Sequence, residues 1–155
     1  MADTIRELII QEIEANLGTL TGGSYDPQIG GAVIRADRFG LDNNVPGIAM
    51  AAGVEEVTRI YRKAEMKMPM ILTASAPYPI SGDRAAQAEI ISKQAEVMLG
   101  YLRSAMGLPV AHADAVQYSQ GGIEDYPDPR NGDTTVMVSA EFNILYKTGI
   151  GDPYQ

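Results

Sequence analysis

The segment 134–147, TTVMVSAEFNILYK, decides the fold. Alternate residues from Val136 to Tyr146 are apolar, and those between them are mostly polar, with Met137 and Leu145 as the exceptions. Because side chains alternate between the two faces of a strand, this pattern predicts one strand with a buried face and a wetter face. Two short strands with a bend between them are the alternative. A strand much longer than the usual length of about five or six residues needs antiparallel neighbours and a helix over its apolar face.

A second segment, 64–76, shows the same alternation and a matching length. We therefore predict that it pairs with 134–147 in one antiparallel sheet, and that residues 54–63 run antiparallel to it. Pro69 falls on its polar side. Because proline has no N–H to donate to a neighbouring strand, a bulge or an edge position is expected there. The face that we expect to be buried carries Ala64, Met66, Met68, Met70, Leu72, Ala74 and Ala76.

The methionine stripe of this second segment allows two interpretations. Met66, Met68 and Met70 share one face of the predicted strand, which is typical of a protein core. Methionine side chains also adapt to irregular partners, so a contact surface is the alternative. Under that alternative the three residues are candidates for a subunit interface.

Two helices are expected to cover the sheet. Thr4 and Glu7 have the spacing of a capping box, and an apolar stripe at steps of three and four residues then runs to residue 17. A second helix is expected to begin near residues 81–83 and to continue to about residue 106. At a length of roughly 36 Å, this helix can cover a whole sheet face.

The other segments are shorter or richer in turn-forming residues. Short strands are expected at 32–36, 46–53 and 116–118. The segment 120–133 is acidic and turn-rich, and 148–155 is expected to be a mobile, exposed tail. Together these elements predict an α+β fold, in which an antiparallel (mixed) β-sheet packs against two α-helices. The whole chain, 1–155, is predicted to form a single domain.

Composition narrows the range of functions. The chain has no Cys, which excludes disulfides and thiolate metal sites. Its net charge of −8 argues against a general binder of nucleic acid or anionic membranes. The sequence contains no run of about 18 apolar residues, so no membrane span is predicted. The charged first residues do not resemble a signal peptide, so a cytoplasmic protein is expected.

Groups suited to catalysis are sparse in the sequence. His112 is the only histidine, and although Asp114 could orient it, an exposed or structural histidine is the prediction. The acidic pairs 55–56 and 124–125 have no placed partner and are interpreted as solvated loops. The glycines at 121–122 do not lie between a strand and a helix, so no phosphate loop is predicted. No catalytic, cofactor-binding or metal-binding residue is therefore predicted.

The order of elements, and the stretches FNILYKT at 142–148 and GDPY at 151–154, resemble the tail terminator family of long-tailed bacteriophages. Members of this family are also called tail completion or neck proteins. The resemblance also includes the first helix, the strand that follows Val54 and the helix at 83–106, and so covers most of the chain. It is a resemblance of pattern, carried by no single diagnostic motif.

The resemblance implies a structural virion protein and no enzyme. Family members form a ring, usually of six copies, that caps the tail tube, ends its polymerisation and joins the tail to the head. The implied partners are further copies of this chain, the tail tube protein and a head–tail connector or stopper protein. DNA would pass through the ring without specific binding. The protein would be assembled in the host cytoplasm and reside in the virion tail or neck, with no cofactor and no membrane.

Two sets of residues are candidates for these contacts. Acidic residues in segments interpreted as loops are candidates for a channel or docking surface: Asp37, Asp42, Glu124, Asp125 and Asp128. The tail supplies candidates for the subunit interface, in addition to the methionines: Asp152, Pro153 and Tyr154. An acidic ring would repel the phosphates of passing DNA, and ring closure could cover the edges of long strands.

Two rival classes remain at the level of sequence. One is another neck protein of the same virion, such as a head-completion or sheath-capping subunit. The other is a small ligand-binding domain or enzyme with a pocket under the second helix. An apolar pocket with convergent carboxylates would favour the latter class.

Overall fold

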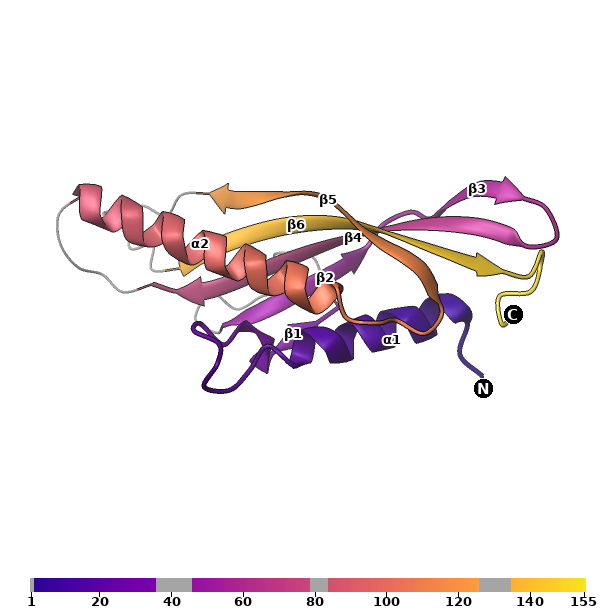
Figure 1. Ribbon diagram of the computed structural model, residues 1–155, viewed down its shortest axis with the longest axis horizontal. Helices are drawn as coiled ribbons and strands as arrows, with labels where there is room; N and C mark the ends of the chain where they lie inside the picture. The colour runs from indigo at the N-terminus through magenta and orange to yellow at the C-terminus, as the bar shows by residue number, and fades with distance from the viewer. Residues whose placement is uncertain (1, 36–45, 79–83, 126–134) are drawn as a thin grey trace.

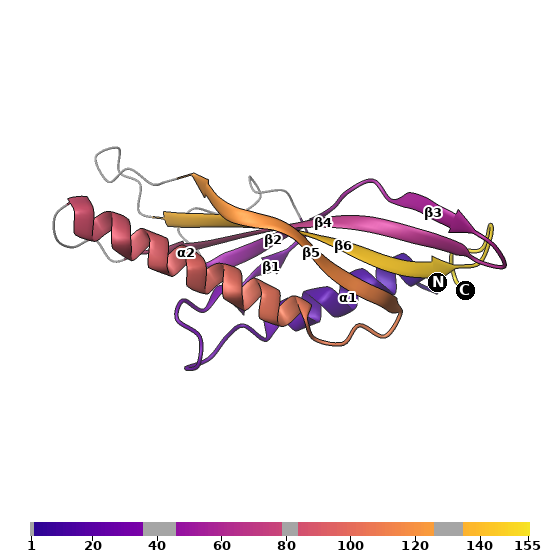
Figure 2. The same ribbon diagram turned by 45° about the horizontal axis from the view of Figure 1, so that its top comes forward.

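The computed structural model describes residues 2–35, 46–78, 84–125 and 135–155, with backbone only at Arg84 and Asp125. A mixed six-stranded sheet packs against two α-helices in one domain, which confirms the predicted α+β fold. Figure 1 shows both helices on the same face of the sheet, and Figure 2 shows the molecule turned about its horizontal axis. The elements are α1 (Ile5–Gly18), η1 (Ile29–Gly31), β1 (Val33–Ile34), β2 (Gly47–Ala52), β3 (Glu56–Ile60), β4 (Ala64–Pro77), α2 (Arg84–Met106), β5 (Ala113–Asp125) and β6 (Thr135–Thr148).

The sheet is built around β4 and β6, as predicted. They pair antiparallel over their whole length, from Ala64 opposite Thr148 to Pro77 opposite Thr135. The alternate apolar residues of β6 are at most 2% exposed, so the single long strand is confirmed and the alternative with a bend is wrong. The complete strand order is β1-β2-β4-β6-β5, in which only β1 and β2 pair in parallel, and β3 pairs with β4 beside this path.

The core lies between this face of the sheet and the two helices. From α1, Ile9, Ile13 and Leu17 are buried, and from α2, Met98 and Leu102. Helix α1 begins as predicted, because the backbone N–H of residue 7 donates to the Thr4 hydroxyl at 3.1 Å. The second half of the predicted capping box is replaced by other contacts. The Glu7 carboxylate accepts from the Gln11 side chain and pairs with Arg35 at 2.8 Å.

Pro69 shows why a proline can sit in a central strand. We expected a bulge or an edge position, but Pro69 lies in β4, opposite Asn143 of β6. On its other side, β2 pairs with β4 from residue 70 onward and β3 pairs only up to residue 67. The Pro69 carbonyl accepts from the Gly53 N–H at 2.7 Å on that side. The position that lacks an N–H therefore faces the gap between the end of β2 and the start of β3, where no strand needs it as a donor.

Strand β5 is much longer than predicted. The expected strand at 116–118 extends over Ala113–Asp125, so the first six of the 14 residues of the predicted turn-rich segment 120–133 belong to a paired strand. Gly121 and Gly122 lie opposite Ala140 and Ser139 of β6, and register shifts on both sides of this pair bend the strand. Pairing with β6 thus overrides the weak strand preference of glycine.

Candidate functional site

In the part of the chain that the structure describes, several exposed apolar side chains lie on the hairpin of β3 and the start of β4, residues 56–67, which we call the arm. Every residue of β3 is exposed, and the tip of the arm extends past the ends of both helices (Figures 1 and 2). Val57 is 50% exposed, Ile60 64% and Tyr61 67%. Exposed apolar side chains on one projecting element make the arm a candidate contact surface.

The arm is also basic, in contrast to the acidic chain as a whole. The chain has a net charge of −8 and only 12 Lys and Arg residues. The Arg62 guanidinium lies 5.7 Å from the centre of the Tyr61 ring, which keeps charge and apolar surface together at the tip. Five of the 12 belong to the arm or to the strand end that pairs with it: Arg59, Arg62, Lys63, Lys67 and Lys147.

A polar cluster fastens the base of the arm to the body. The Tyr146 hydroxyl of β6 donates to Glu55, and the Nε of Arg6 in α1 lies 3.4 Å from the same carboxylate oxygen. Burial and the hydrogen bond to Glu55 both raise the pKa of Tyr146. Glu55 lies in an exposed loop between β2 and β3, as predicted, but the expectation that it has no partner is wrong. The three residues are far apart in sequence, and no local pattern connects them.

The predicted tail is an ordered turn. The Thr148 hydroxyl donates to the Asp152 carbonyl at 2.8 Å, and Gly151 has a φ of +73°, which glycine adopts without strain. The Pro153 carbonyl accepts from the N–H of Ile5 at 2.9 Å, so the tail satisfies an open donor at the start of α1. The tail is exposed, as predicted, but it is a hydrogen-bonded turn, and its truncation would also remove a contact with α1.

The candidate interface residues fall into two groups. Met68 and Met70 are fully buried and Met66 is 9% exposed, so the core interpretation is confirmed and these side chains offer little surface to a neighbour. Asp152 is engaged within the tail turn, where its carboxylate accepts from the N–H of residue 154 at 3.0 Å. Tyr154 is 48% exposed and remains available for contact.

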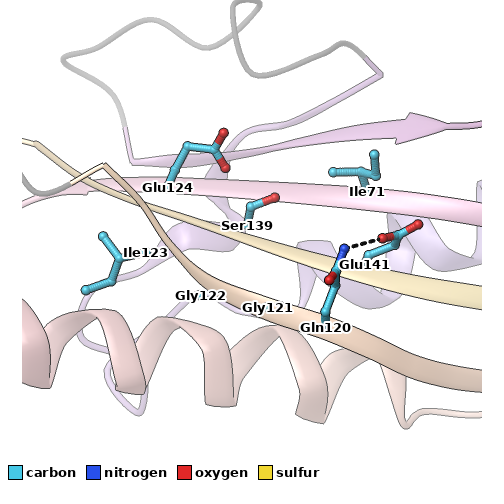
Figure 3. A pocket seen from close by; sticks show the side chains of 8 residues that line it. All are labelled: Ile71, Gln120, Gly121, Gly122, Ile123, Glu124, Ser139 and Glu141. Carbon is cyan, nitrogen blue, oxygen red and sulfur yellow. Dashed lines mark hydrogen bonds between the residues drawn. The ribbon is translucent and has the colours of Figure 1, made fainter.

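The face of the sheet opposite the helices carries a shallow hollow of about 350 Å³ (Figure 3). Gly122 leaves its floor open, because nothing lies within 4 Å of the place where a Cβ would be. Ile71 of β4 is 43% exposed at the hollow, whereas Ile123 points to the other side, towards α2. The Glu141 carboxylate accepts from the Gln120 amide at 2.9 Å, and Glu124 also lines the hollow. The hollow therefore combines an open backbone floor, one apolar side chain and two carboxylates.

The structure places only part of the predicted acidic surface. Glu124 and Asp125 lie at the end of β5 and not in a loop, and Glu124 belongs to the hollow. Asp37, Asp42 and Asp128 lie outside the described residues.

The lone histidine takes no part in a cluster. His112 is exposed in a turn, and its neighbour Asp114 lies 3.7 Å from the Lys147 ammonium. Among the residues that the structure describes, no group of three or more His, Asp or Glu could hold a metal ion. Neither described helix has the length and apolar character to cross a membrane.

A comparison with protein-family models and with curated proteins found no match to this chain. The arm and the hollow each carry exposed apolar groups and charge.

Proposed function

We propose that this chain is a structural subunit of a bacteriophage tail terminator. In this role, copies of the chain form a ring of six that caps the tail tube, ends its polymerisation and joins the tail to the head connector or stopper protein. The protein works without a cofactor and catalyses no reaction. It is assembled in the host cytoplasm and stays in the virion neck.

The observation that carries the proposal is the uncovered arm. Val57, Ile60 and Tyr61 leave half or more of their surface in water, although full burial of an aliphatic side chain is worth about 1.5–3 kcal/mol. Such surface is typical of a subunit that completes its packing against other chains. This supports an assembly protein over a ligand-binding domain or enzyme.

Charge supports the proposed passage of DNA. At a net charge of −8, a ring of several copies would repel phosphates over much of its surface. The basic residues are concentrated on the arm, and contact with another subunit would remove them from the channel. The acidic candidates Asp37, Asp42 and Asp128 are proposed to face the channel or a docking partner.

Loss of the protein in the encoding phage tests the proposal. We expect heads and tubes that do not join, with tubes of uncontrolled length in electron micrographs, and rescue by the gene supplied in trans. Tails of normal length attached to heads would refute the terminator role. Tails of normal length that do not join heads would instead identify a head-completion protein. Tubes of controlled length with a defective sheath would identify a sheath-capping subunit.

A further inference from the structure

We infer that the arm of one copy docks on the hollow of the next copy, so that this contact joins the subunits of the assembly. The inference rests on the proposed function in one respect, the need for a contact between identical chains. The arm supplies exposed apolar side chains and positive charge, and the hollow supplies Ile71, an open glycine floor and the carboxylates of Glu124 and Glu141.

Charge complementarity selects a second copy as the occupant. The arm has four Lys or Arg residues and two Glu residues, a net charge of +2, whereas the lining of the hollow holds two Glu residues and no Lys or Arg. Two copies placed head to tail bring the basic end of one against the acidic part of the other. Two copies placed arm to arm would oppose like charges.

A subunit cannot place its own arm in its own hollow. Ile71 and Ala64, which begins the β4 side of the arm, are seven residues apart on one continuous strand, a separation of roughly 23 Å. Because β4 is paired with β6 along this whole stretch, the arm cannot fold back. The contact must therefore form between chains.

The edges of the sheet favour the same arrangement. In the described part of the chain, β3 pairs with β4 alone and β5 with β6 alone, so each presents one open edge. The open edge of β5 borders the hollow, and that of β3 runs along the arm. Docking covers both edges, and because it joins two different surfaces, it generates a ring when the rotation between copies closes.

Disulfide capture tests the contact directly, because the natural chain has no Cys. Tyr61→Cys places a thiol on the arm, and Gly122→Cys places one on the hollow floor, where a Cβ meets nothing within 4 Å. In the double variant we expect a ladder of covalent multimers on oxidation. The matched control pairs Tyr61→Cys with Val97→Cys on the exposed side of α2, where Val97 is 40% exposed, and should give no ladder.

A charge exchange tests complementarity. The arm variant R59E/R62E and the hollow variant E124K/E141K should each associate at least tenfold more weakly than the natural chain in light-scattering titrations. An equimolar mixture should recover association, because each contact then joins opposite charges. Lys93→Glu on α2, where the side chain is 72% exposed, is the control for altered charge and should have no effect.

Circular dichroism of every variant establishes that it is folded before association is compared. A double-cysteine variant with no more multimers than its control would overturn the inference, as would a mixture that stays dissociated. If the ladder is absent but loss of the gene still gives long, unjoined tubes, the contact is wrong and the proposed function stands. If the ladder forms but gene loss leaves normal attached tails, the contact stands and the proposed function falls.

Discussion

The helix-covered body and the arm use the same strand in opposite ways. On the body, the inward face of β4 is buried beneath the helices, with Met68 and Leu72 at 0% exposure. On the arm, Val57 and Ile60 of β3 lie opposite Met66 and Ala64, yet both are at least half exposed. The apolar surface of the sheet thus continues past the helices. The body shows what stabilises the subunit, and the arm shows what remains for a neighbour.

The largest effect on stability is expected in the body, at Phe142. Phe142→Ala should lower the free energy of unfolding by about 3–5 kcal/mol, because the ring is 2% exposed and its removal leaves a cavity in the body. Asn143→Ala, one residue further on the opposite face, should cost less than about 1 kcal/mol. Denaturant titration of both variants measures the difference. Equal losses would contradict the register of β6.

The next largest effect on stability is expected at Gly30, which packs against the backbone at the end of α1. A Cβ at Gly30 would lie 2.6 Å from the Leu17 carbonyl oxygen and 2.8 Å from the Leu20 backbone nitrogen, and neither can move freely. Gly30→Ala should therefore destabilise the fold by about 1–3 kcal/mol. Gly31→Ala is the matched control, because nothing lies within 4 Å of its Cβ position. Thermal unfolding that shifts equally in both variants would refute this packing.

The body and the antiparallel pairing of the arm were predictable from the sequence, but the exposure of the arm was not. Alternation over the length of β4 and β6 is a strong signal, since a slip of one residue would expose the whole buried face. The strand at 54–63 was predicted beside β4, but local pattern does not tell whether a helix covers it. Exposure of Val57 and Ile60 follows from the lengths and positions of α1 and α2, which are tertiary properties.

The polar contacts at the base of the arm were missed for a related reason. Arg6, Glu55 and Tyr146 come from three distant segments, and each of them looks ordinary in its own segment. Likewise, the sequence does not reveal that the Pro153 carbonyl accepts from the Ile5 N–H, because this contact depends on where the start of α1 lies in the fold. β5 was predicted too short because its glycines and polar residues hide the pairing with β6. In each case long-range pairing overrides local preference.

A smaller effect is expected at the junction between body and arm. Tyr146→Phe removes the donor to Glu55 and should cost about 1 kcal/mol at neutral pH, since Glu55 is partly exposed and keeps its Arg6 partner. Burial and this hydrogen bond raise the pKa of Tyr146, so the folded state favours the neutral phenol. The resulting stability is fully present below the ordinary tyrosine pKa of about 10 and is lost as the pH rises through the higher folded value.

Unfolding by urea from pH 7 to pH 11 measures this linkage. The natural chain should lose stability above pH 10, and Tyr146→Phe should show a shallower decline because its phenol no longer ionises. Tyr154→Phe is the matched control, since Tyr154 is 48% exposed in the tail, and it should keep its neutral-pH stability within about 0.5 kcal/mol. An unchanged slope in Tyr146→Phe would mean that this hydroxyl does not hold the arm to the body.

The smallest effect on stability is expected on the arm itself, where the comparison is sharpest. Ile60 is 64% exposed, so Ile60→Ser should change the free energy of unfolding by less than about 0.5 kcal/mol. The same change should weaken association between copies, because it replaces apolar surface at the inferred contact with a hydroxyl that must be desolvated. Val97→Ser on α2 is matched for exposed apolar surface and should leave both quantities unchanged.

A large loss of stability in Ile60→Ser would show that the arm belongs to the body's core. Unchanged association would show that its apolar surface serves another partner.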